Sequence, residues 1–445
     1  MFGFCLAENE LTREWRSGGV GKANSSRPGH ARLASRVVGC ALGHAGGVAA
    51  PFSSSEIQAI RDTTPGCRDE LIHLNHAGSS LPDQRVLDRQ MEHLHLEAMI
   101  GGYEAAAAAG DAQIEVTASI ARLLSVGVTE IARVEHATAA WNAAFWSIPM
   151  RAGQRIITHD QDYGANWIAF LRAAEIHGVL IDRISSDRFG QIDLEGLAIA
   201  LERPDDVAVV SLAWIPTSGG LVNPAAAVGA LTRAADVPFL LDACQAVGQL
   251  DIDANAIGCD FLSATGRKYL RGPRGTGFLY VREESLDRFV PSQPDHHGAD
   301  WSSMESYTFV EGAARFEHWE YSHAAWLGLG AAIDTALELG LDRIQATIGE
   351  RAKELRAGVT EAGFAVHDDG IAKCGIVTAT HPTLPASDVM AALSHHNINA
   401  TTTYIGSARA DMEARGLAPM VRLSVHCTTT PDEIERTTRV LAALQ

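Results

Sequence analysis

Three neighbouring stretches decide the fold: Leu241-Asp-Ala-Cys-Gln-Ala-Val-Gly248, Cys259-Asp-Phe-Leu-Ser-Ala-Thr-Gly-Arg-Lys268 and Gly272-Pro-Arg-Gly-Thr-Gly-Phe-Leu-Tyr-Val281. Each contains the whole or the end of a short apolar run, and polar residues follow the first two runs at once. Continuous apolar runs are typical of strands in sheets that are covered on both faces, and such sheets are usually parallel. The stretches therefore predict neighbouring buried strands whose carboxyl ends carry polar turns.

The chain keeps the same alternation on the N-terminal side of these stretches. Predicted strands lie at 155–158, 179–181 and 207–212, and helical stretches lie at 166–177 and 224–235. Strands that alternate with helices are typical of βαβ units, in which helices cover both faces of one sheet. The predicted fold class is α/β, with a mostly parallel sheet flanked by helices.

The pattern of predicted helices and strands changes in the C-terminal third of the chain. Two helical stretches lead into a strand over 421–425, where Val and Leu alternate with polar residues that include Arg422. Such alternation predicts a half-buried strand with Arg422 on the side away from the apolar residues. We therefore expect a large domain at 70–315 and a smaller C-terminal α+β domain at 316–445.

Residues 1–69 are rich in Gly, Ser, Ala and Arg and have no clear periodicity. This composition predicts a poorly ordered extension outside the fold. A basic stretch before the apolar run 37–52 leaves a second interpretation open, since a basic flank is typical of a secretion signal or transit peptide. Glycines and His44 break that run, and no run reaches the roughly 18–20 apolar residues that span a membrane.

The composition limits the classes of partner. The 445 residues are 46% hydrophobic and 20% charged, and 36 Lys and Arg against 54 Asp and Glu give a net charge of −18. This charge disfavours nucleic acid and anionic membranes. Seven scattered cysteines without a CxxC pair indicate no disulfide framework, so a reducing cytoplasm is the expected location. The His pairs at 296–297 and 395–396 lack a Cys or carboxylate to complete a tetrahedral set, so no metal is expected.

Lysine is rare in this chain, which has it only at positions 22, 268, 353 and 373. Lys268 follows a short apolar strand and precedes a glycine-rich turn, whereas a solvated lysine normally lies on a polar helix face. Asp242 ends another buried run, where a carboxylate is costly unless a cation or a hydrogen-bond donor meets it. Ligands of such sheets bind at the carboxyl ends of the strands, so both residues are candidates for one site.

Other polar residues near predicted strand ends add the donors that a phosphate needs. Thr138, Thr265 and Arg267 offer hydroxyl and guanidinium groups, and Tyr163 lies in a glycine-bearing loop where it can stack on an aromatic ring. Together with the lysine and the aspartate, this set matches pyridoxal phosphate. That cofactor is a phosphorylated pyridine aldehyde that forms a Schiff base with lysine and needs an acidic partner at its ring nitrogen.

Several of these residues have a structural alternative. Asp242 is also well placed to cap a following helix, and Tyr163 can be an ordinary loop aromatic. Arg422 can pair with a carboxylate on a neighbouring strand. Cys244 and Cys259 are most simply small buried hydrophobes.

Residues 71–445 resemble the class V aminotransferase family of fold type I pyridoxal phosphate enzymes. This family includes cysteine desulfurases, isopenicillin N epimerase-like proteins and hercynylcysteine sulfoxide lyases. The most specific match is the stretch from Leu241 to Val281. Supporting matches are Leu74-Asn-His-Ala77, Ala137-Thr-Ala-Ala-Trp-Asn142, Asp162-Tyr-Gly-Ala165, Gly219-Gly-Leu-Val-Asn-Pro224 and Pro419-Met-Val-Arg-Leu-Ser424. The resemblance implies pyridoxal 5'-phosphate as the cofactor, a small amino acid as the substrate and a homodimer.

The resemblance also implies a role for each candidate residue. Some contact the ring or the phosphate of the cofactor, and others contact the substrate. The implied residues are Lys268 for covalent attachment and catalysis, Asp242 for the ring nitrogen, Gln245 and Thr217 for the phenolic oxygen, Tyr163 for stacking, Thr138, Thr265 and Arg267 for the phosphate, and Arg422 with Asn75 for the substrate, whose α-carboxylate Arg422 receives.

Four positions depart from the pattern of the family. Arg267 stands where the family often has His before the lysine, and Thr217 stands where it usually has Asn. Glu320 falls where a neighbouring subunit often lends a threonine to the phosphate, and an anion is unsuited to that role. The segment 398–416 contains no Cys, whereas cysteine desulfurases need a nucleophilic Cys on the corresponding loop to accept sulfur.

Several reactions at the substrate Cα remain open. Transamination is the first interpretation, and β-elimination with C–S cleavage and epimerisation are alternatives, because all three begin when Lys268 removes the Cα proton. A catalytically silent binding subunit is a further alternative, which the intact Lys268 and Arg422 disfavour. The absence of an acceptor Cys disfavours a persulfide-forming desulfurase. The loops that determine the substrate are expected at 73–80, 295–309 and 399–409.

Overall fold

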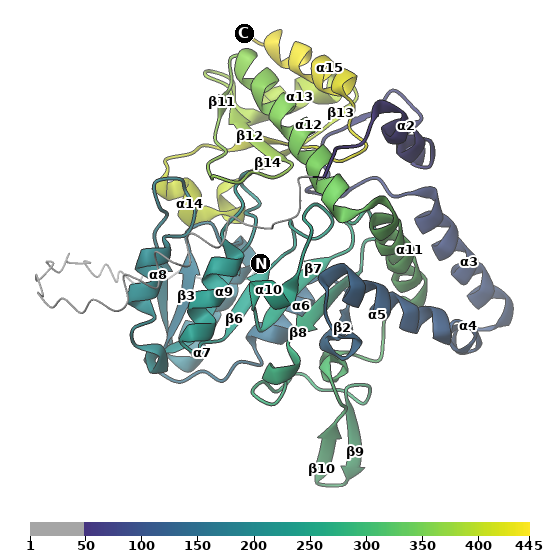
Figure 1. The fold of residues 1–445 in the computed structure, drawn as a ribbon, viewed down its shortest axis with the longest axis vertical. Coiled ribbons are helices and arrows are strands. Elements are labelled where there is room, and N and C mark those ends of the chain that lie inside the picture. The colour runs from purple at the N-terminus through teal and green to yellow at the C-terminus, as the bar shows by residue number, and fades with distance from the viewer. Residues whose placement is uncertain (1–48) are drawn as a thin grey trace, which may run out of the picture.

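The computed structural model describes residues 49–445, which form one large and one smaller lobe (Figure 1). The part of the predicted extension at 1–48 lies outside the described residues. Residues 49–69 are folded, which corrects the prediction that the fold begins at residue 70. Helix α2 (Ser54–Asp62) occupies most of this segment.

The segment before residue 70 is held by both local and distant contacts. A capping box starts α2, because the side chains of Ser53 and Glu56 accept hydrogen bonds from each other's backbone N–H groups. Ile57 and Ile60 are buried in the main core. The Phe52 N–H donates to Thr347 Oγ1 at 2.9 Å, nearly three hundred residues away in the sequence. The composition of the segment by itself does not reveal such distant contacts.

The larger sheet consists of β2 (Ile131–Val134), β3 (Arg155–His159), β4 (Leu180–Ile184), β5 (Val207–Ala213), β6 (Phe239–Asp242), β7 (Phe261–Thr265) and β8 (Gly277–Val281). Its strand order is β2-β8-β7-β6-β5-β3-β4. The strands from β4 across to β7 are parallel, and β8 is antiparallel to both β7 and β2. The predicted mostly parallel sheet is therefore confirmed.

Helices cover both faces of this sheet, as the α/β prediction requires. One face packs against α6 (Ala137–Phe145) and α7 (Gly164–His177). Leu240 belongs to the core on that face and its neighbour Leu241 to the core on the other face, because successive side chains of a strand point to opposite sides. The helices on the second face are α5 (Gly110–Leu124), α8 (Leu194–Ala200), α9 (Ala225–Ala234) and α10 (Ala254–Ile257).

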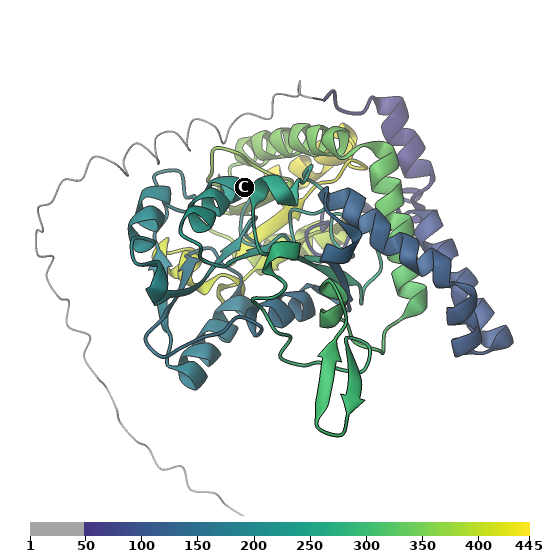
Figure 2. The ribbon, with the colours of Figure 1, turned by 60° about the horizontal axis from the view of Figure 1, so that its bottom comes forward.

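A group of long helices flanks the sheet on its β2 side (Figure 1). Helix α11 (His323–Leu339) packs against α3 (Gln84–Ile100) and α5, and α4 (Gly102–Ala108) connects α3 to α5. A hairpin of β9 (Ala299–Ser303) and β10 (Ser306–Phe309) projects away from the body of the large lobe (Figure 2).

The smaller lobe contains an antiparallel sheet of β11 (Ala365–Val366), β12 (Ile376–Thr380), β15 (Met420–Ser424) and β14 (Thr401–Thr403), in that order. A separate parallel pair joins β1 (Ile72–His73) to β13 (Ile398–Asn399), so the N-terminal segment belongs to this lobe. Its helices are α12 (Leu341–Glu361), α13 (Ala386–His395), α14 (Arg409–Ala414) and α15 (Pro431–Ala442). A capping box starts α15, because the side chains of Thr430 and Glu433 accept hydrogen bonds from each other's backbone N–H groups. Short 3-10 helices occupy connections: η1 (Pro65–Cys67), η2 (Val128–Glu130), η3 (Pro204–Asp206), η4 (Glu283–Ser285), η5 (Ala313–Phe316) and η6 (Ile405–Ser407).

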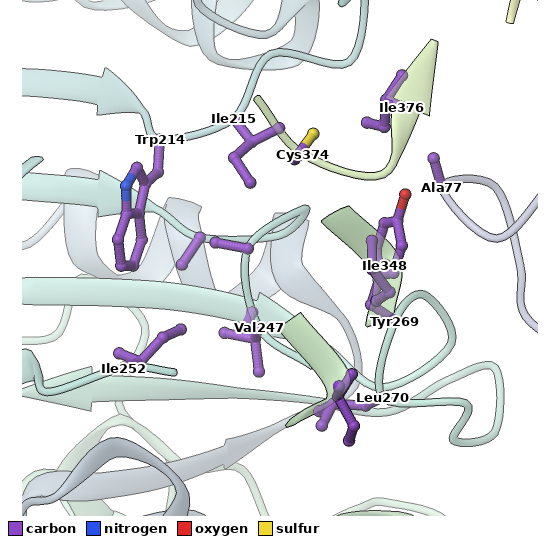
Figure 3. Packing of buried hydrophobic residues seen from close by; sticks show 14 of the residues in the cluster. Ala77, Trp214, Ile215, Val247, Ile252, Tyr269, Leu270, Ile348, Cys374 and Ile376 are labelled. Carbon is purple, nitrogen blue, oxygen red and sulfur yellow. The ribbon is translucent and has the colours of Figure 1, made fainter. Parts of the chain in front are cut away.

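The two lobes share one apolar core. Ile348 of α12 and Ile376 of β12 lie in the same buried cluster as Trp214, Val247 and Tyr269 of the large lobe (Figure 3). A shared core fixes the relative position of the lobes, because any displacement would expose apolar surface from both. It places β15 close to the carboxyl ends of the large sheet.

Within residues 49–445, no single helix is long and apolar enough to cross a membrane. Helices α11 and α12 meet the length and composition criteria only as a pair, and they are bent by 82° at their junction.

Candidate active site

A pocket of about 640 Å³, measured with its open mouth, lies at the carboxyl ends of the central strands. This is where ligands bind in open α/β sheets. The structure brings together eight of the ten predicted site residues along its wall: Thr138, Tyr163, Thr217, Asp242, Gln245, Thr265, Arg267 and Lys268.

Lys268 lies in the turn that follows β7 and is half-buried in the pocket wall. Cys244 lines the pocket beside Lys268. Burial raises the pKa of the Cys244 thiol, while the nearby Lys268 ammonium lowers it by a smaller amount. Cys244 is thus a wall residue that remains a thiol at neutral pH.

Asp242 ends β6 and accepts two hydrogen bonds. The Cys244 N–H donates to Oδ1 at 3.0 Å, and Asn166 Nδ2 donates to Oδ2 at 3.2 Å. The first bond closes an Asx turn. The structural alternative of a helix cap was wrong, because a turn and not a helix follows β6. The side chain also lines the pocket, so Asp242 combines a local turn with a carboxylate that a ligand can reach.

Two polar residues near Asp242 were not among the predicted site residues, and one of them, Asn166, lines the pocket itself. Asn166 of α7 links Asp242 to a second carboxylate, Asp162, which is fully buried. Burial raises the pKa of Asp162 to about 6, and hydrogen bonds from Thr158 and Asn166 oppose the shift. Asp162 directly precedes Tyr163, the N-cap of α7, and Asn166 lies in the first turn of that helix. A polar residue just before a helix and another in its first turn were the signal available in the sequence.

The N-terminus of α6 forms one side of the pocket. His136 is the N-cap, and its Nδ1 accepts from the Ala139 N–H at 3.0 Å. The next residues, including the exposed Thr138, line the pocket. A Cβ at Gly277 would lie 2.8 Å from the His136 carbonyl carbon, so a glycine at the start of β8 permits this close approach. Backbone N–H groups at a helix start attract phosphate.

The two other predicted phosphate residues already have partners. Thr265 is buried, and its Oγ1 donates to the Thr276 carbonyl oxygen at 3.1 Å. Arg267 Nη1 donates to the Gly78 carbonyl oxygen. This second contact ties the β7 turn to the N-terminal segment and leaves the other guanidinium N–H groups of Arg267 for a ligand.

Arg422 and Asn75 do not line the pocket itself, and Arg422 adjoins it through Thr217. Arg422 Nη1 donates to Thr217 Oγ1 at 2.7 Å and to the Thr217 carbonyl oxygen at 3.2 Å. Asn75 bridges to Ser424 of β15. The prediction of a half-buried strand was wrong, since every residue of β15 is buried and Arg422 is only 8% exposed. The other lobe covers the face that alternation assigned to solvent.

The polar groups of the pocket fit pyridoxal phosphate. Among the described residues, Trp141 Nε1 and Gln245 Oε1 are buried in the wall without a hydrogen-bond partner, and buried polar atoms normally have one. Gln245 can present either its oxygen or its nitrogen to the phenolic oxygen of the ring. Lys268, the Asp242 carboxylate and the α6 N-terminus supply the remaining chemistry that the cofactor requires. Nowhere in residues 49–445 do three or more His, Cys, Asp or Glu side chains gather as a metal site.

The fold and the pocket together define a pyridoxal phosphate enzyme of fold type I. A family model described as Aminotransferase class-V matches residues 72–437, so the chain belongs to this family. Pyridoxal phosphate is the cofactor, as the sequence predicted.

Curated relatives extend over most of the chain. It is 28% identical over 377 residues to a probable hercynylcysteine sulfoxide lyase from Mycobacterium tuberculosis, which covers 84% of this chain and 90% of the relative. It is 25% identical over 304 residues to a probable cysteine desulfurase from Methanothermobacter thermautotrophicus, which covers 68% of this chain and 75% of the relative.

Solved structures show the same fold at low identity. The apo structure of a cysteine desulfurase from Thermococcus onnurineus has a TM-score of 0.81 and 23% identity, and covers 89% of this chain and 99% of its own. A complex of the cystine C–S lyase C-DES has a TM-score of 0.75 and 20% identity, and covers 85% of this chain and 99% of its own. These likenesses support the fold type.

Proposed function

We propose that the protein is a pyridoxal phosphate-dependent lyase that breaks the Cβ–S bond of a cysteine-derived α-amino acid and releases the sulfur fragment into solution. The names of the curated relatives, a probable hercynylcysteine sulfoxide lyase and probable cysteine desulfurases, support C–S chemistry over the transamination that was the first interpretation.

One observation distinguishes release from transfer to a protein thiol. Cys244 is the single cysteine among the residues that line the described pocket, and burial raises the pKa of its thiol. The chain has no cysteine between Cys374 and Cys427, a range that includes the segment 398–416. A sulfur acceptor must be a thiolate that meets the substrate sulfur. These residues therefore favour a lyase over a persulfide-forming desulfurase.

Each residue of the site has a separate role in this reaction. When bound, pyridoxal phosphate supplies an electron sink for the negative charge that develops at the substrate Cα. The Lys268 amine takes the proton from Cα and acts as a general base. Thr217 orients the buried Arg422 guanidinium, whose remaining N–H groups would bind the α-carboxylate through two parallel hydrogen bonds. Loss of the sulfur substituent from Cβ then follows, and hydrolysis yields pyruvate and ammonia.

Product analysis tests this proposal. The holoenzyme is incubated with cysteine, S-substituted cysteines and their sulfoxides, with and without a keto acid, and pyruvate, ammonia and the released sulfur species are measured. We expect pyruvate, ammonia and a thiol or sulfenate in equal amounts without a keto acid. Lys268→Ala should abolish this release, whereas Lys353→Ala, at an exposed position on α12, should not.

Other products would contradict the lyase. Turnover that requires a keto acid and yields a new amino acid would establish an aminotransferase. A racemised substrate with no released sulfur would establish an epimerase, and a persulfide on the protein would establish a desulfurase.

We infer that the protein forms a homodimer in the cytoplasm. The β9–β10 hairpin exposes Trp301, Met304 and Tyr307 by 69%, 78% and 54%, and a projecting apolar hairpin is typical of an interface between chains. The five described cysteines are free, as suits a reducing compartment. Light scattering during gel filtration should give twice the chain mass, and Trp301→Ser should lower it, while the monomer mass for the native chain would refute the dimer.

A further inference from the structure

A second carboxylate lies behind the pocket and has no role in the chemistry described so far. Asp162 follows β3 and is completely buried. Its Oδ2 accepts from Thr158 Oγ1 at 2.7 Å and from Ser211 Oγ at 3.2 Å. Burying a carboxylate costs free energy, and hydrogen-bond donors only partly offset that cost. The cost indicates that Asp162 has a function.

The other oxygen of Asp162 organises the residues that face the cofactor. Oδ1 accepts from the Tyr163 N–H at 2.7 Å and from Asn166 Nδ2 at 2.8 Å. The same Nδ2 atom donates to Asp242 Oδ2 at 3.2 Å. One amide group therefore stands between two carboxylates and gives one hydrogen to each, and Asp162 also holds the backbone at the start of α7.

The orientation of the Asn166 amide depends on the charge of Asp162. A carboxylate only accepts hydrogen bonds, so it keeps the NH2 side of the amide turned toward both acids. A neutral amide at position 162 could donate to Asn166 and turn it over. The Asn166 oxygen would then face the Asp242 carboxylate, and the two acceptors would repel each other.

We propose that Asp162 is a positioning residue, which acts through Asn166 to hold the Asp242 carboxylate in the orientation that binds the protonated ring nitrogen of pyridoxal phosphate. The proposal rests on the assignment of Asp242 to that nitrogen and not on the type of reaction. Asp242 is the charged group that acts on Asp162 from β6, while the neighbours from β3, β5 and α7 are the neutral Thr158, Ser211 and Asn166.

The ring nitrogen of the bound cofactor reports directly on this contact. Pyridoxal phosphate labelled with ¹⁵N is bound to the purified protein, and the ¹⁵N resonance is followed against pH together with the dissociation constant of the cofactor. For Asp162→Asn we expect about tenfold weaker cofactor binding, the size of one hydrogen bond to a charged group. The pH at which the nitrogen loses its proton should fall by about one unit, which is the same factor of ten.

Two further variants separate positioning from a general effect on folding. Asn166→Ala removes the bridge and leaves the Thr158, Ser211 and Tyr163 contacts to Asp162 in place, so it should reproduce both changes even if Asp162→Asn does not fold. Ser211→Ala removes the weaker bond to Asp162 Oδ2 and leaves the bridge in place, so it should change neither. The proposal is overturned if Asn166→Ala leaves the nitrogen resonance as in the wild type, or if Ser211→Ala shifts it equally. A lyase test that fails would leave these results unaffected.

Discussion

Charged side chains of both signs lie in or next to the pocket that Lys268 lines, among polar residues such as Gln245 and Thr265. Arg267 and Asp242 line the pocket with Lys268. Arg422 reaches it through Thr217, and Asp162 through Asn166. Burial weakens solvent screening, so each charge influences its neighbours more strongly than it would at the surface. The charge and the ligand contacts of each residue in this group therefore depend on the positions of its neighbours.

The attachment residue is the first prediction at this scale. Reduction of the holoenzyme with borohydride, followed by peptide mapping, should place the pyridoxyl label on Lys268, because it is the lysine whose side chain lines the described pocket. Lys353 and Lys373 serve as internal controls, since both are exposed. A label on either of them in place of Lys268 would refute the assignment.

Arg422 gives the second prediction. Lysine has a point charge in place of the planar guanidinium fork, so Arg422→Lys loses the two-pronged contact with a carboxylate and the bond to Thr217. We expect the dissociation constant of α-amino acids to rise about tenfold or more, with a smaller rise for matched amines that lack the carboxylate. Titration of the holoenzyme with both series measures this difference, and equal losses would indicate a purely structural arginine.

Among the elements, helix α9 packs very closely against α10 on the second face of the large sheet. Gly229 is buried in α9, and a Cβ there would lie 1.9 Å from the Ile257 carbonyl oxygen at the end of α10. Such a distance requires backbone movement, because a carbonyl oxygen is not the flexible end of a side chain. The close packing of α9 against α10 therefore requires glycine.

A matched pair of glycine substitutions tests this packing. Gly229→Ala should lower the free energy of unfolding by about 2 kcal/mol or more through overpacking. Gly349 lies in the middle of α12 at an exposed position, and a Cβ added there would meet no atom within 4 Å. Gly349→Ala should therefore raise the free energy of unfolding by about 1 kcal/mol through helix propensity. Urea unfolding measures both, and a Gly229→Ala variant as stable as the wild type would show that α9 can move.

At the scale of the whole molecule, buried histidines make stability depend on pH. His76 and His426 lie together at the junction of the lobes, with ring centroids 5.1 Å apart, and His159 is buried at the end of β3. Burial lowers the pKa of His159 and His426 to about 3 and that of His76 well below its usual value. These rings are therefore neutral in the native state.

The sign of the pH effect follows from these shifts. Because the native pKa values lie below the unfolded value of about 6.5, the unfolded chain binds more protons as the pH falls, and stability is lost between about pH 6.5 and about pH 3. Burial also raises the pKa values of Asp160, Asp162 and Asp411, and this acts in the opposite direction because the native state then binds more protons. These are three groups against six histidines with lowered pKa values, namely His73, His76, His159, His323, His367 and His426. We expect the urea midpoint to fall between about pH 7 and about pH 5.

A variant pair identifies the groups responsible. His426 Nε2 bonds to the Tyr269 carbonyl oxygen at 2.9 Å, and its Nδ1 accepts from the Cys427 N–H at 2.8 Å. His426→Gln should be less stable at neutral pH and should lose part of the acid dependence. His395→Gln, at an exposed position on α13, should retain it. An acid dependence that is unchanged in His426→Gln would rule out this histidine as a cause.

The sequence by itself determined the features that local residues control. Apolar runs such as Phe239–Leu241 and the polar turns after them predicted the parallel sheet and the edge where Lys268 and Asp242 meet, because a strand end and its turn are neighbours in the chain. The pyridoxal phosphate cofactor followed from the chemistry of those turns and from the family motif. Those predictions did not depend on how the two lobes pack against each other.

Only the tertiary structure decided the rest. The burial of Arg422, the folding of residues 49–69 and the bridge from Asp162 through Asn166 to Asp242 all depend on contacts between segments that are far apart in the sequence. Alternation in β15 predicted a solvent-facing arginine because it cannot show that a second lobe covers that face. Burial and hydrogen bonding depend on which surfaces meet in space. The free energy gained when two surfaces pack depends on the residues of both, so neither segment predicts it alone.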